Sequence, residues 1–407
     1  MTQTSAPSPS LLRIAGLPYF VIAFIARLPF AMMVVGVLTI VVTARGSLAL
    51  GGITSAAVGL GTAVIGPFLG AAADRFGQRP VLVAAAVLNA VMLGAFAAVV
   101  YSPLSEGLIL LSAFAIGASA PQVAPMSRSR LVTIIDEQMP SERRIRTTSA
   151  TMSYESAADE TVFVVGPFLV GVLASLIAPW APIVLASALT LVFVGAFALH
   201  PTGRHVSAAR SAGGAAPSAV SDLFRPALLV VVVGILGVGL FFGATLTALT
   251  SFMADRGAAE QAGLLYGVMG IGSAILALGV AWLPARFTVH ARWLVFGGIL
   301  LAGSVLVATA SSIGMMTLAL ALLGVGVGPT LVTLYSLGAA RSPLGRSATV
   351  MTMLGSAVVV GQAAAAAITG GLAESVGTAP ALLLPLIASA IVVTAGITNR
   401  LLPASRL

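Results

Sequence analysis

The sequence contains no cysteine and no lysine, and these absences exclude several kinds of function. Without cysteine, the chain can form neither disulfides nor thiolate metal sites, and it has no thiol nucleophile. It also has no G-x-x-x-x-G-K-[ST] loop, which an ATP-driven pump would need to hold phosphate. The three histidines, His200, His205 and His290, fall in predicted loops and assemble no metal site or catalytic triad. We therefore expect neither an enzyme nor a protein with a metal or cofactor.

Charged residues are also scarce. They make up 8% of the 407 residues, whereas a soluble domain carries about 25%. Hydrophobic residues make up 58%, and the mean hydropathy is +1.09. A water-soluble fold of this size would need far more polar side chains to cover its surface. The composition predicts a membrane protein, so we attribute the net charge of +8 to its loops and not to a nucleic-acid-binding surface.

Long apolar runs recur along the chain, each close to or above the roughly 20 residues that cross a bilayer as a helix. Twelve spanning helices are predicted, at 17–42, 50–72, 81–100, 106–126, 148–176, 180–199, 226–252, 260–283, 293–310, 313–338, 347–373 and 378–400. The first run is longer than the apolar region of a cleaved signal peptide, which is about 7–15 residues, so we interpret it as a retained helix. The sequence thus predicts an all-α membrane protein.

The arginines are distributed unevenly between the two sets of loops. One set of loops, with the two ends of the chain, carries Arg13, Arg75, Arg79, Arg128, Arg130, Arg143, Arg144, Arg146, Arg204, Arg210, Arg225, Arg286, Arg292, Arg341, Arg346, Arg400 and Arg406. The other set has only Arg45 and Arg256, and Arg27 lies inside a predicted helix. Because loops rich in basic residues stay in the cytoplasm, we expect a multi-pass cell-membrane protein with both termini cytoplasmic.

The longest polar break lies near the middle of the chain, at residues 200–225, and is rich in Gly, Ala, Ser and Pro. Such a composition is typical of a flexible linker. The predicted parts are a tail at 1–16, a six-helix bundle at 17–199, the linker at 200–225, a second bundle at 226–400 and a tail at 401–407. At a spacing of 200 residues, Arg146 matches Arg346 and Ser156 matches Ser356. This weak repeat favours two pseudo-symmetric bundles, with chance similarity between Ala- and Gly-rich helices as the alternative.

The loop after the second predicted helix has the sequence GAAADRFGQR at residues 70–79. Its notable residues are Gly70, Asp74, Arg75, Gly77 and Arg79. The segment resembles the G-x-x-x-D-R-x-G-R-R signature of the major facilitator superfamily, with Gln78 in place of one basic residue. Gly70 would allow close helix packing, Gly77 a tight turn, and Asp74 an interaction with the positive end of another helix. The resemblance implies a twelve-helix transporter that works by alternating access, in which this loop braces the two halves. An ordinary arginine-containing loop is the alternative.

The fifth predicted helix contains three acids, Glu155, Asp159 and Glu160, in a segment that then becomes apolar. A carboxylate inside the membrane costs several kcal/mol, so it is usually paired and functional. Glu155 and Asp159 are four residues apart and share a face, whereas Glu160 points about 100° away from Asp159. In the resembled fold the first and fifth helices are neighbours, so we predict that Arg27 pairs with Asp159 or Glu160. We interpret the group as a proton-coupling or substrate-binding cluster, with a structural ion pair as the alternative.

The same helix continues with Gly166, Pro167 and Gly171, which resemble part of the helix-5 motif of drug–proton antiporters. The match is partial, and a proline kink that membrane helices tolerate is the alternative. The predicted fourth helix also lacks the arginine that this antiporter branch usually has, so we expect Arg27 to take its role. Candidate polar groups of a central cavity are Gln122, Tyr335 and Gln362.

Together these features predict a secondary active transporter that exports a small organic or drug-like compound in exchange for protons. Its partners would be a small-molecule substrate, protons and the lipid bilayer, and we expect a monomer. A proton-coupled uptake symporter of a small metabolite is an alternative with the same fold. A non-transporting membrane scaffold or receptor is an alternative of another class, which the three acids disfavour because a scaffold does not need them.

Overall fold

The computed structural model describes residues 10–203, 218–258, 261–284 and 286–402. Twelve helical segments in these ranges are long and apolar enough to cross a membrane, as the sequence predicts. They are Leu17–Arg45, Leu50–Phe76, Gln78–Tyr101, Glu106–Gln138, Ser141–Leu176, Ala181–Leu199, Pro226–Ala254, Ala262–Trp282, Val289–Ala308, Ile313–Ala340, Ser347–Ser375 and Thr378–Leu401. Their ends agree with the predicted ends to within four residues, except where the fourth segment ends and the fifth begins.

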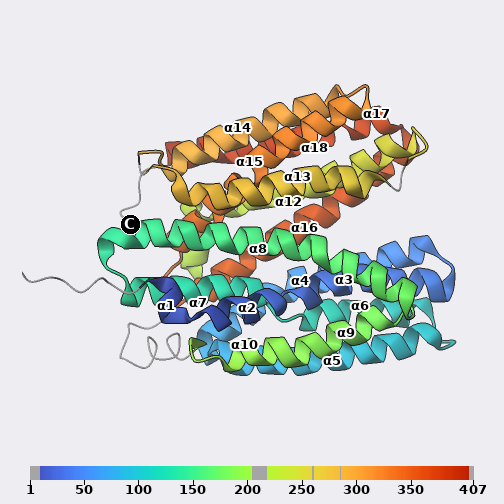
Figure 1. Ribbon diagram of the computed structural model, residues 1–407, viewed down its shortest axis with the longest axis horizontal. Helices are drawn as coiled ribbons and strands as arrows, with labels where there is room; N and C mark the ends of the chain where they lie inside the picture. The colour runs from blue at the N-terminus through green and yellow to red at the C-terminus, as the bar shows by residue number, and fades with distance from the viewer. Residues whose placement is uncertain (1–9, 204–217, 259–260, 285, 403–407) are drawn as a thin grey trace, which may run out of the picture.

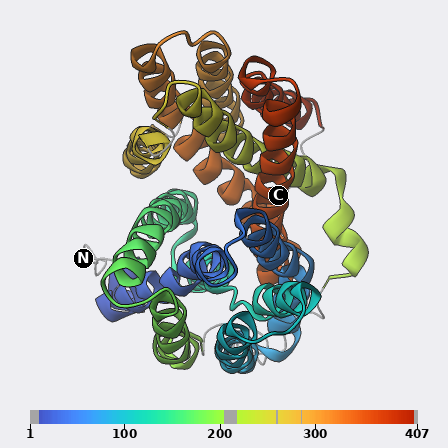
Figure 2. The same ribbon diagram turned by 90° about the vertical axis from the view of Figure 1, so that its right-hand side faces the viewer.

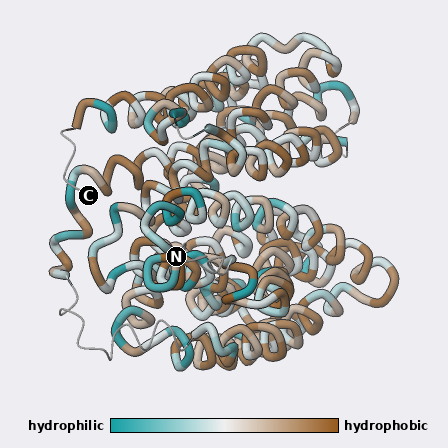
Figure 3. The backbone as a smooth tube through the Cα atoms, turned by 60° about the vertical axis from the view of Figure 1, so that its left-hand side comes forward, coloured by the Kyte–Doolittle hydropathy of each residue, from teal (hydrophilic) through white to brown (hydrophobic). Residues whose placement is uncertain are grey.

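The helices form two bundles that lie side by side (Figures 1 and 2). The first bundle, preceded by α1 (Leu11–Ala15), contains α2 (Leu17–Ile25), α3 (Leu28–Arg45), α4 (Leu48–Phe76), α5 (Gln78–Tyr101), α6 (Glu106–Ser119), α7 (Val123–Gln138), α8 (Ser141–Leu176), α9 (Ala181–Leu189), the π-helical η1 (Thr190–Val194) and α10 (Gly195–Leu199). The second, preceded by η2 (Val220–Phe224), contains α12 (Pro226–Ala254), α13 (Ala262–Gly279), η4 (Val280–Trp282), α14 (Val289–Ala308), α15 (Ile313–Ala340), α16 (Ser347–Ser375), α17 (Thr378–Ala381) and α18 (Leu384–Leu401). Hydrophobic residues run along both bundles (Figure 3).

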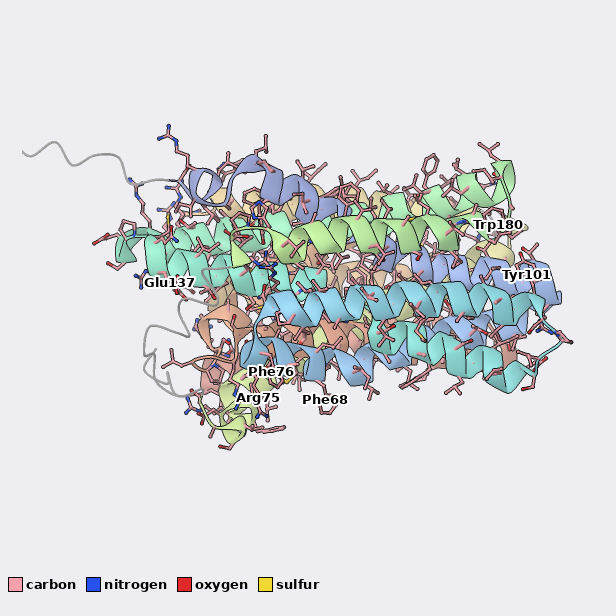
Figure 4. The ribbon with its side chains drawn as sticks, turned by 90° about the horizontal axis from the view of Figure 1, so that it is seen from below. Phe68, Arg75, Phe76, Tyr101, Glu137 and Trp180 are labelled. Atoms are coloured by element: carbon pink, nitrogen blue, oxygen red, sulfur yellow. The ribbon has the colours of Figure 1, made fainter. Side chains whose placement is uncertain are left out.

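The two ends of the bundles differ. We call the end at which α10 leads toward α12 the linker side, and Arg75, Phe76 and Glu137 lie toward it (Figure 4). Tyr101 and Trp180 lie toward the opposite end. Of the predicted linker and tails, residues 204–217, 1–9 and 403–407 lie outside the described residues, and so does His205. At residue 218, after this gap, the backbone N–H of Ser218 donates to the Leu344 carbonyl at 3.0 Å.

Two segments of the first bundle are interrupted at prolines. The first segment breaks between α2 and α3, where Pro29 cannot donate to the carbonyl of Ile25 and its ring would clash with it. The fourth breaks between α6 and α7, around Pro121. Both breaks lie inside the bundle. There the backbone N–H and C=O groups that an unbroken helix would pair with each other are free to bind other groups in the protein.

The predicted end of the fourth helix at residue 126 is wrong. The chain resumes as α7, and Arg128 and Arg130, which we expected in a loop, are 2% and 0% exposed. The fifth helix begins seven residues earlier than predicted, at Ser141 rather than 148. The prediction ended the helix here because a hydropathy scale assigns an unfavourable free energy to every buried arginine. Both side chains, however, form hydrogen bonds with other side chains inside the protein.

The predicted loop before the ninth helix is also shorter than expected. His290 and Arg292 lie within α14 and not in a loop. Arg292 is 8% exposed, and its Nε donates to the Phe287 carbonyl at 2.7 Å. As in α7, a hydrogen bond to a protein group stabilises a charged side chain that hydropathy alone would place in a water-exposed loop.

Candidate functional site

Arg27 lies at the break between α2 and α3 and is 4% exposed. Its Nη1 donates to Asp159 Oδ1 at 3.1 Å, and its Nη2 pairs with the carboxylate of Glu155. Arg27 therefore pairs with Asp159, which is one of the two predicted pairings. It also pairs with Glu155, which was not predicted as its partner. The other predicted pairing, between Arg27 and Glu160, is not formed. Both acids face the arginine because they lie four residues apart on one face of α8.

Asp159 lies between two arginines. Arg27 binds Oδ1, and Arg128 of α7 binds the other carboxylate oxygen, with 2.6 Å between Nη2 and Oδ2. The guanidinium of Arg128 also lies over the ring of Tyr335, with 4.0 Å from Cζ to the ring centroid. Because Tyr335 belongs to α15, this stack joins the first bundle to the second. We call Arg27, Arg128, Glu155, Asp159 and Glu160 the charge cluster.

Two hydroxyl groups extend the charge cluster within the first bundle. Ser127 Oγ donates to Glu155 Oε1 at 2.9 Å, and Tyr19 Oη lies 2.8 Å from Ser127 Oγ. Tyr19, Ser127 and Glu155 are all 0% exposed. The side-chain oxygens of Tyr19, Ser127 and Glu155 therefore all have hydrogen-bond partners within the protein, as buried polar groups require.

Glu160 faces the second bundle and not the arginines. Ser273 of α13 donates its hydroxyl hydrogen bond to Glu160 Oε1. This placement agrees with the 100° rotation between consecutive helical residues. Within the part of the chain that the structure describes, Glu160 forms no ion pair.

Asp74, at the end of α4, contacts the first turn of α16 in the second bundle. Its carboxylate accepts hydrogen bonds from the backbone N–H of Ala348 at 3.0 Å and of Thr349 at 2.7 Å, and from Thr349 Oγ1 at 2.6 Å. The predicted interaction with a helix N-terminus is thus present, and the partner helix belongs to the other half. A carboxylate in this position is favoured by the partial positive charge of the helix end.

The other residues of this motif differ in what they contact. A Cβ on Gly70 would lie 2.1 Å from Thr352 Oγ1 and 2.7 Å from the Ala348 carbonyl, so α4 and α16 can meet this closely only at a glycine. Gly77 has a φ of 97° and ends α4 with a turn. Arg75 and Arg79 are exposed, and the guanidinium of Arg75 lies 5.2 Å from the ring centroid of Phe76.

The three residues of the helix-5 motif have unequal surroundings in α8. A Cβ on Gly166 would lie 2.7 Å from the Cβ of Ala31, so this glycine lets α8 approach α3. Gly171 has no such neighbour, because nothing lies within 4 Å of its Cβ position. Pro167 lies inside α8, which continues to Leu176. Helix packing accounts for Gly166 alone.

The three cavity candidates also lie in different places. Gln122 directly precedes α7, and its Nε2 donates to the Ala120 carbonyl at 3.0 Å. Tyr335 is buried under Arg128, and Gln362 is exposed on α16. None of them lines either of two apolar surface grooves, of about 760 and 480 Å³, on α5 and between α12 and α18. Their role in a central cavity stays a prediction.

Sequence reasoning missed four residues of the site: Tyr19, Ser127, Arg128 and Ser273. One signal could have found Arg128. Three acids inside a membrane segment with only one predicted arginine leave two negative charges without a partner, which favours a second buried cation. The three hydroxyl residues carry no such signal, because Ser and Tyr occur in membrane helices for many reasons.

The bundles are joined on the linker side. The Asp74 contacts lie at the linker-side ends of α4 and α16, and Arg292 Nη1 donates to Ser149 Oγ at 3.3 Å near the corresponding ends of α14 and α8. The Arg128–Tyr335 stack and the Glu160–Ser273 hydrogen bond lie farther inside. Among the described residues, these polar contacts between the bundles extend from the linker side to about the middle of the helices.

Comparison with solved structures identifies the fold. The human organic anion transporter MFSD10 (TETRAN) is 19% identical, with a TM-score of 0.70 over 94% of this chain and 97% of that one. A bacterial homologue of the iron transporter ferroportin in an outward-facing state is 15% identical, with a TM-score of 0.75 over 94% and 98%. The E. coli fucose:proton symporter is 17% identical, with a TM-score of 0.60 over 94% and 99%. At these identities the likeness shows the fold alone.

The sequence itself gives the family. No curated protein matches the chain significantly. Residues 19–366, however, match the profile of the Major Facilitator Superfamily, which covers most of the chain, from α2 into α16. This multi-pass membrane protein is a transporter that belongs to the Major Facilitator Superfamily.

Proposed function

We propose that this transporter couples the movement of protons to the export of a small organic or drug-like compound. The observation that carries the proposal is the charge balance of the charge cluster, in which three acids lie with two arginines. With every group ionised, the cluster has one negative charge in excess. Binding one proton removes this excess, so the cluster has the capacity to carry one proton per transport cycle.

Glu160 is the acid on which we place this proton. Glu155 and Asp159 have arginine partners, whereas the hydrogen-bond partner of Glu160 is a neutral group, Ser273. A carboxylate taken out of water without a cation costs several kcal/mol, and protonation removes that cost. Asp159, the other acid for which the sequence suggested this role, is held between two arginines and is better suited to staying ionised.

Proton binding at Glu160 would act directly on the contact between the bundles. The Ser273 hydroxyl donates across the boundary to Glu160. A hydrogen bond to an ionised carboxylate is roughly twice as strong as one between neutral groups. Protonation of Glu160 therefore weakens a bond that holds α8 against α13, which favours separation of the bundles at this depth. This gives protonation a mechanical consequence, as coupling requires.

We further propose that the linker side faces the cytoplasm and that the protein acts as a monomer in the cell membrane. Arginine-rich loops support this orientation. Reporter fusions after Leu407 and within residues 204–217 should both give a cytoplasmic signal. A signal from the opposite compartment at either position would contradict this topology.

The coupling is tested in proteoliposomes with an imposed pH gradient. A panel of amphipathic compounds is supplied outside, and the lumen is analysed by mass spectrometry. Exchange for protons predicts accumulation when the lumen is acidic, and Glu160→Gln should abolish it while compound exchange without a gradient persists. Glu106→Gln, which removes an exposed acid at the far end of α6, is the matched control. Accumulation only when the outside is acidic would indicate a symporter, and accumulation that Glu160→Gln leaves unchanged would contradict the assignment of the proton.

A further inference from the structure

The larger of the two apolar grooves lies on a surface that the proposed function does not use. It has a volume of about 760 Å³ and is lined by one face of α5 and by Leu199 at the end of α10. The two helices lie side by side along the lower edge of Figure 1. The lining residues of α5 recur at helical spacing and include Arg79, Val83, Val87 and Val91. All of these side chains are exposed on the outer surface of the first bundle.

The groove has about the length of one leaflet of a bilayer. It extends along α5 from Arg79, the second residue of the helix, to Val91. This length of α-helix corresponds to about 18 Å, and the hydrocarbon of one leaflet is about 15 Å thick. Because α5 begins on the linker side, where Arg75 and Phe76 lie, and ends at Tyr101 on the opposite side, the groove spans the linker-side leaflet (Figure 4).

The linker-side end of the groove is positively charged. Arg79 lies at this end, and Arg75, on the same turn between α4 and α5, is exposed as well. Neither arginine forms an ion pair within the part of the chain that the structure describes. The other residues that line the groove are apolar. The groove therefore offers a cation at the level of the lipid headgroups and a hydrocarbon surface below it.

A further cation lies behind the groove. Arg130 of α7 is 0% exposed, and its Nε donates to Gln78 Oε1 at the beginning of α5, at 3.0 Å. Its Nη1 donates to the Phe197 carbonyl of α10, also at 3.0 Å, so this side chain joins the two helices that line the groove. Among the described residues, Arg130 has no acidic partner and its Nη2 has no hydrogen-bond partner. A buried cation without a counter-ion makes the potential at the nearby surface more positive, which favours an anion there.

We propose that this groove is a binding site for an anionic phospholipid of the linker-side leaflet, with an acyl chain along α5 and the phosphate at Arg79. An acyl chain covers the exposed apolar side chains, and the phosphate accepts charge-assisted hydrogen bonds from the arginine. A zwitterionic lipid would bring a second cation to the same place. The smaller groove, between α12 and α18, is lined by no charged residue, so we expect no such selectivity there. The site does not depend on the proposed proton coupling, which is measured by transport.

The test is lipid binding to the full-length protein, measured by native mass spectrometry. The protein in detergent is titrated with phosphatidylglycerol or with phosphatidylcholine of the same acyl chains, and the dissociation constants of the first bound lipid are compared. We expect the wild type to prefer phosphatidylglycerol by about fivefold or more, because one arginine near a membrane surface contributes about this factor to the binding of an anionic lipid. Arg79→Gln should remove the preference and leave the binding of phosphatidylcholine unchanged.

A second variant tests the apolar part of the site. Ala84 is exposed and lines the groove, so Ala84→Phe fills space that the acyl chain needs and should weaken the binding of phosphatidylglycerol. Ala95→Phe is the matched control, because Ala95 is also exposed on α5 but lies beyond the groove. Arg286→Gln is the control for charge, since it removes an exposed arginine between η4 and α14 that lines neither groove. Both controls should keep the affinity and the preference of the wild type.

Four results would overturn the site. Equal affinity of the wild type for the two lipids would remove its selectivity, and equal losses in Arg79→Gln and Arg286→Gln would indicate general attraction by the net charge. Displacement of phosphatidylglycerol by the same concentration of inorganic phosphate would show that the groove contributes nothing. A dimer that Ala84→Phe abolishes and Ala95→Phe retains would assign the groove to a second copy of the chain.

Discussion

Arg128 and Tyr335 join the two bundles through a cation–π contact, with 4.0 Å between the guanidinium carbon and the ring centroid. The same guanidinium holds Asp159 at 2.6 Å. The contact is buried on both sides, since Arg128 is 2% and Tyr335 6% exposed. Any movement that separates the bundles at this depth must therefore either break the stack or draw Arg128 away from Asp159.

Tyr335→Leu should favour the arrangement in which the linker side is open. A desolvated cation–π contact contributes about 2 kcal/mol, which corresponds to a shift of about thirtyfold between two states. Spin labels at Ile145→Cys and Leu344→Cys, both exposed on the linker side, report the distance between the bundles. The absence of native cysteine makes this labelling specific. Tyr335→Phe keeps the ring and should retain the wild-type distance distribution, and a wild-type distribution in Tyr335→Leu would show that the stack does not hold the bundles together.

Asp74→Asn should reduce transport by about fivefold or more while leaving the amount of folded protein unchanged. The carboxylate accepts three hydrogen bonds from the start of α16, and an amide can replace some of these but carries no charge for the helix end. Loss of such an interaction costs about 1–2 kcal/mol. Transport normalised to folded protein is the measurement, and Asp255→Asn, at an exposed acid after α12, is the control. Full transport by Asp74→Asn would remove the bracing role of this motif.

Gly70→Ala should open the linker side through a different physical cause. The added methyl group would lie within 2.7 Å of the Ala348 carbonyl, so α4 and α16 must move apart. Gly94→Ala adds the same group to α5, where nothing lies within 4 Å, and should be neutral or stabilising by up to about 1 kcal/mol. The same pair of spin labels distinguishes the two variants. Equal distance distributions would show that the packing at Gly70 tolerates a side chain.

The sequence predicted the number of spanning helices and most of their ends because hydrophobic length is a local property. It also predicted the surroundings of Gly70 and Asp74, since a motif fixes both the helix end and the partner type. It misplaced Arg128 and Arg130 because their burial depends on partners that are distant in the chain. For Arg130 these are the Gln78 side chain, at 3.0 Å, and the Phe197 carbonyl, also at 3.0 Å.

The acids show where such reasoning stops. Spacing along α8 was enough to predict that Glu155 and Asp159 share a face and that Glu160 does not. It could not show that Ser273 of the other bundle lies opposite Glu160, because that depends on how α13 packs against α8. Outside a recognised motif such as the one that contains Asp74, the spacing of residues in one sequence does not predict which side chains of the two halves meet.

The last prediction separates a structural ion pair from a functional one. Arg27→Gln should strongly reduce the amount of folded protein, because it leaves Glu155, which is 0% exposed, without a cation; breaking a buried pair in this way costs about 3–5 kcal/mol. Glu155→Gln should cost less, because Arg27 keeps Asp159 as its partner. The double variant Arg27→Gln, Glu155→Gln removes both charges of one pair and leaves Arg128 with Asp159. We expect it to recover the folded protein of the wild type.

Transport by the same double variant then decides between the two roles. If the pair only fixes packing, restored folding restores pH-driven transport as well. If the Arg27–Glu155 pair takes part in coupling, the double variant folds but accumulates no compound against a pH gradient, while exchange without a gradient continues. Fluorescence-detected size-exclusion chromatography measures the folded protein, and the proteoliposome assay measures transport. The Arg128–Asp159 pair is unchanged in this variant. If pH-driven transport recovers in proportion to the amount of folded protein, Arg27 and Glu155 contribute to packing alone.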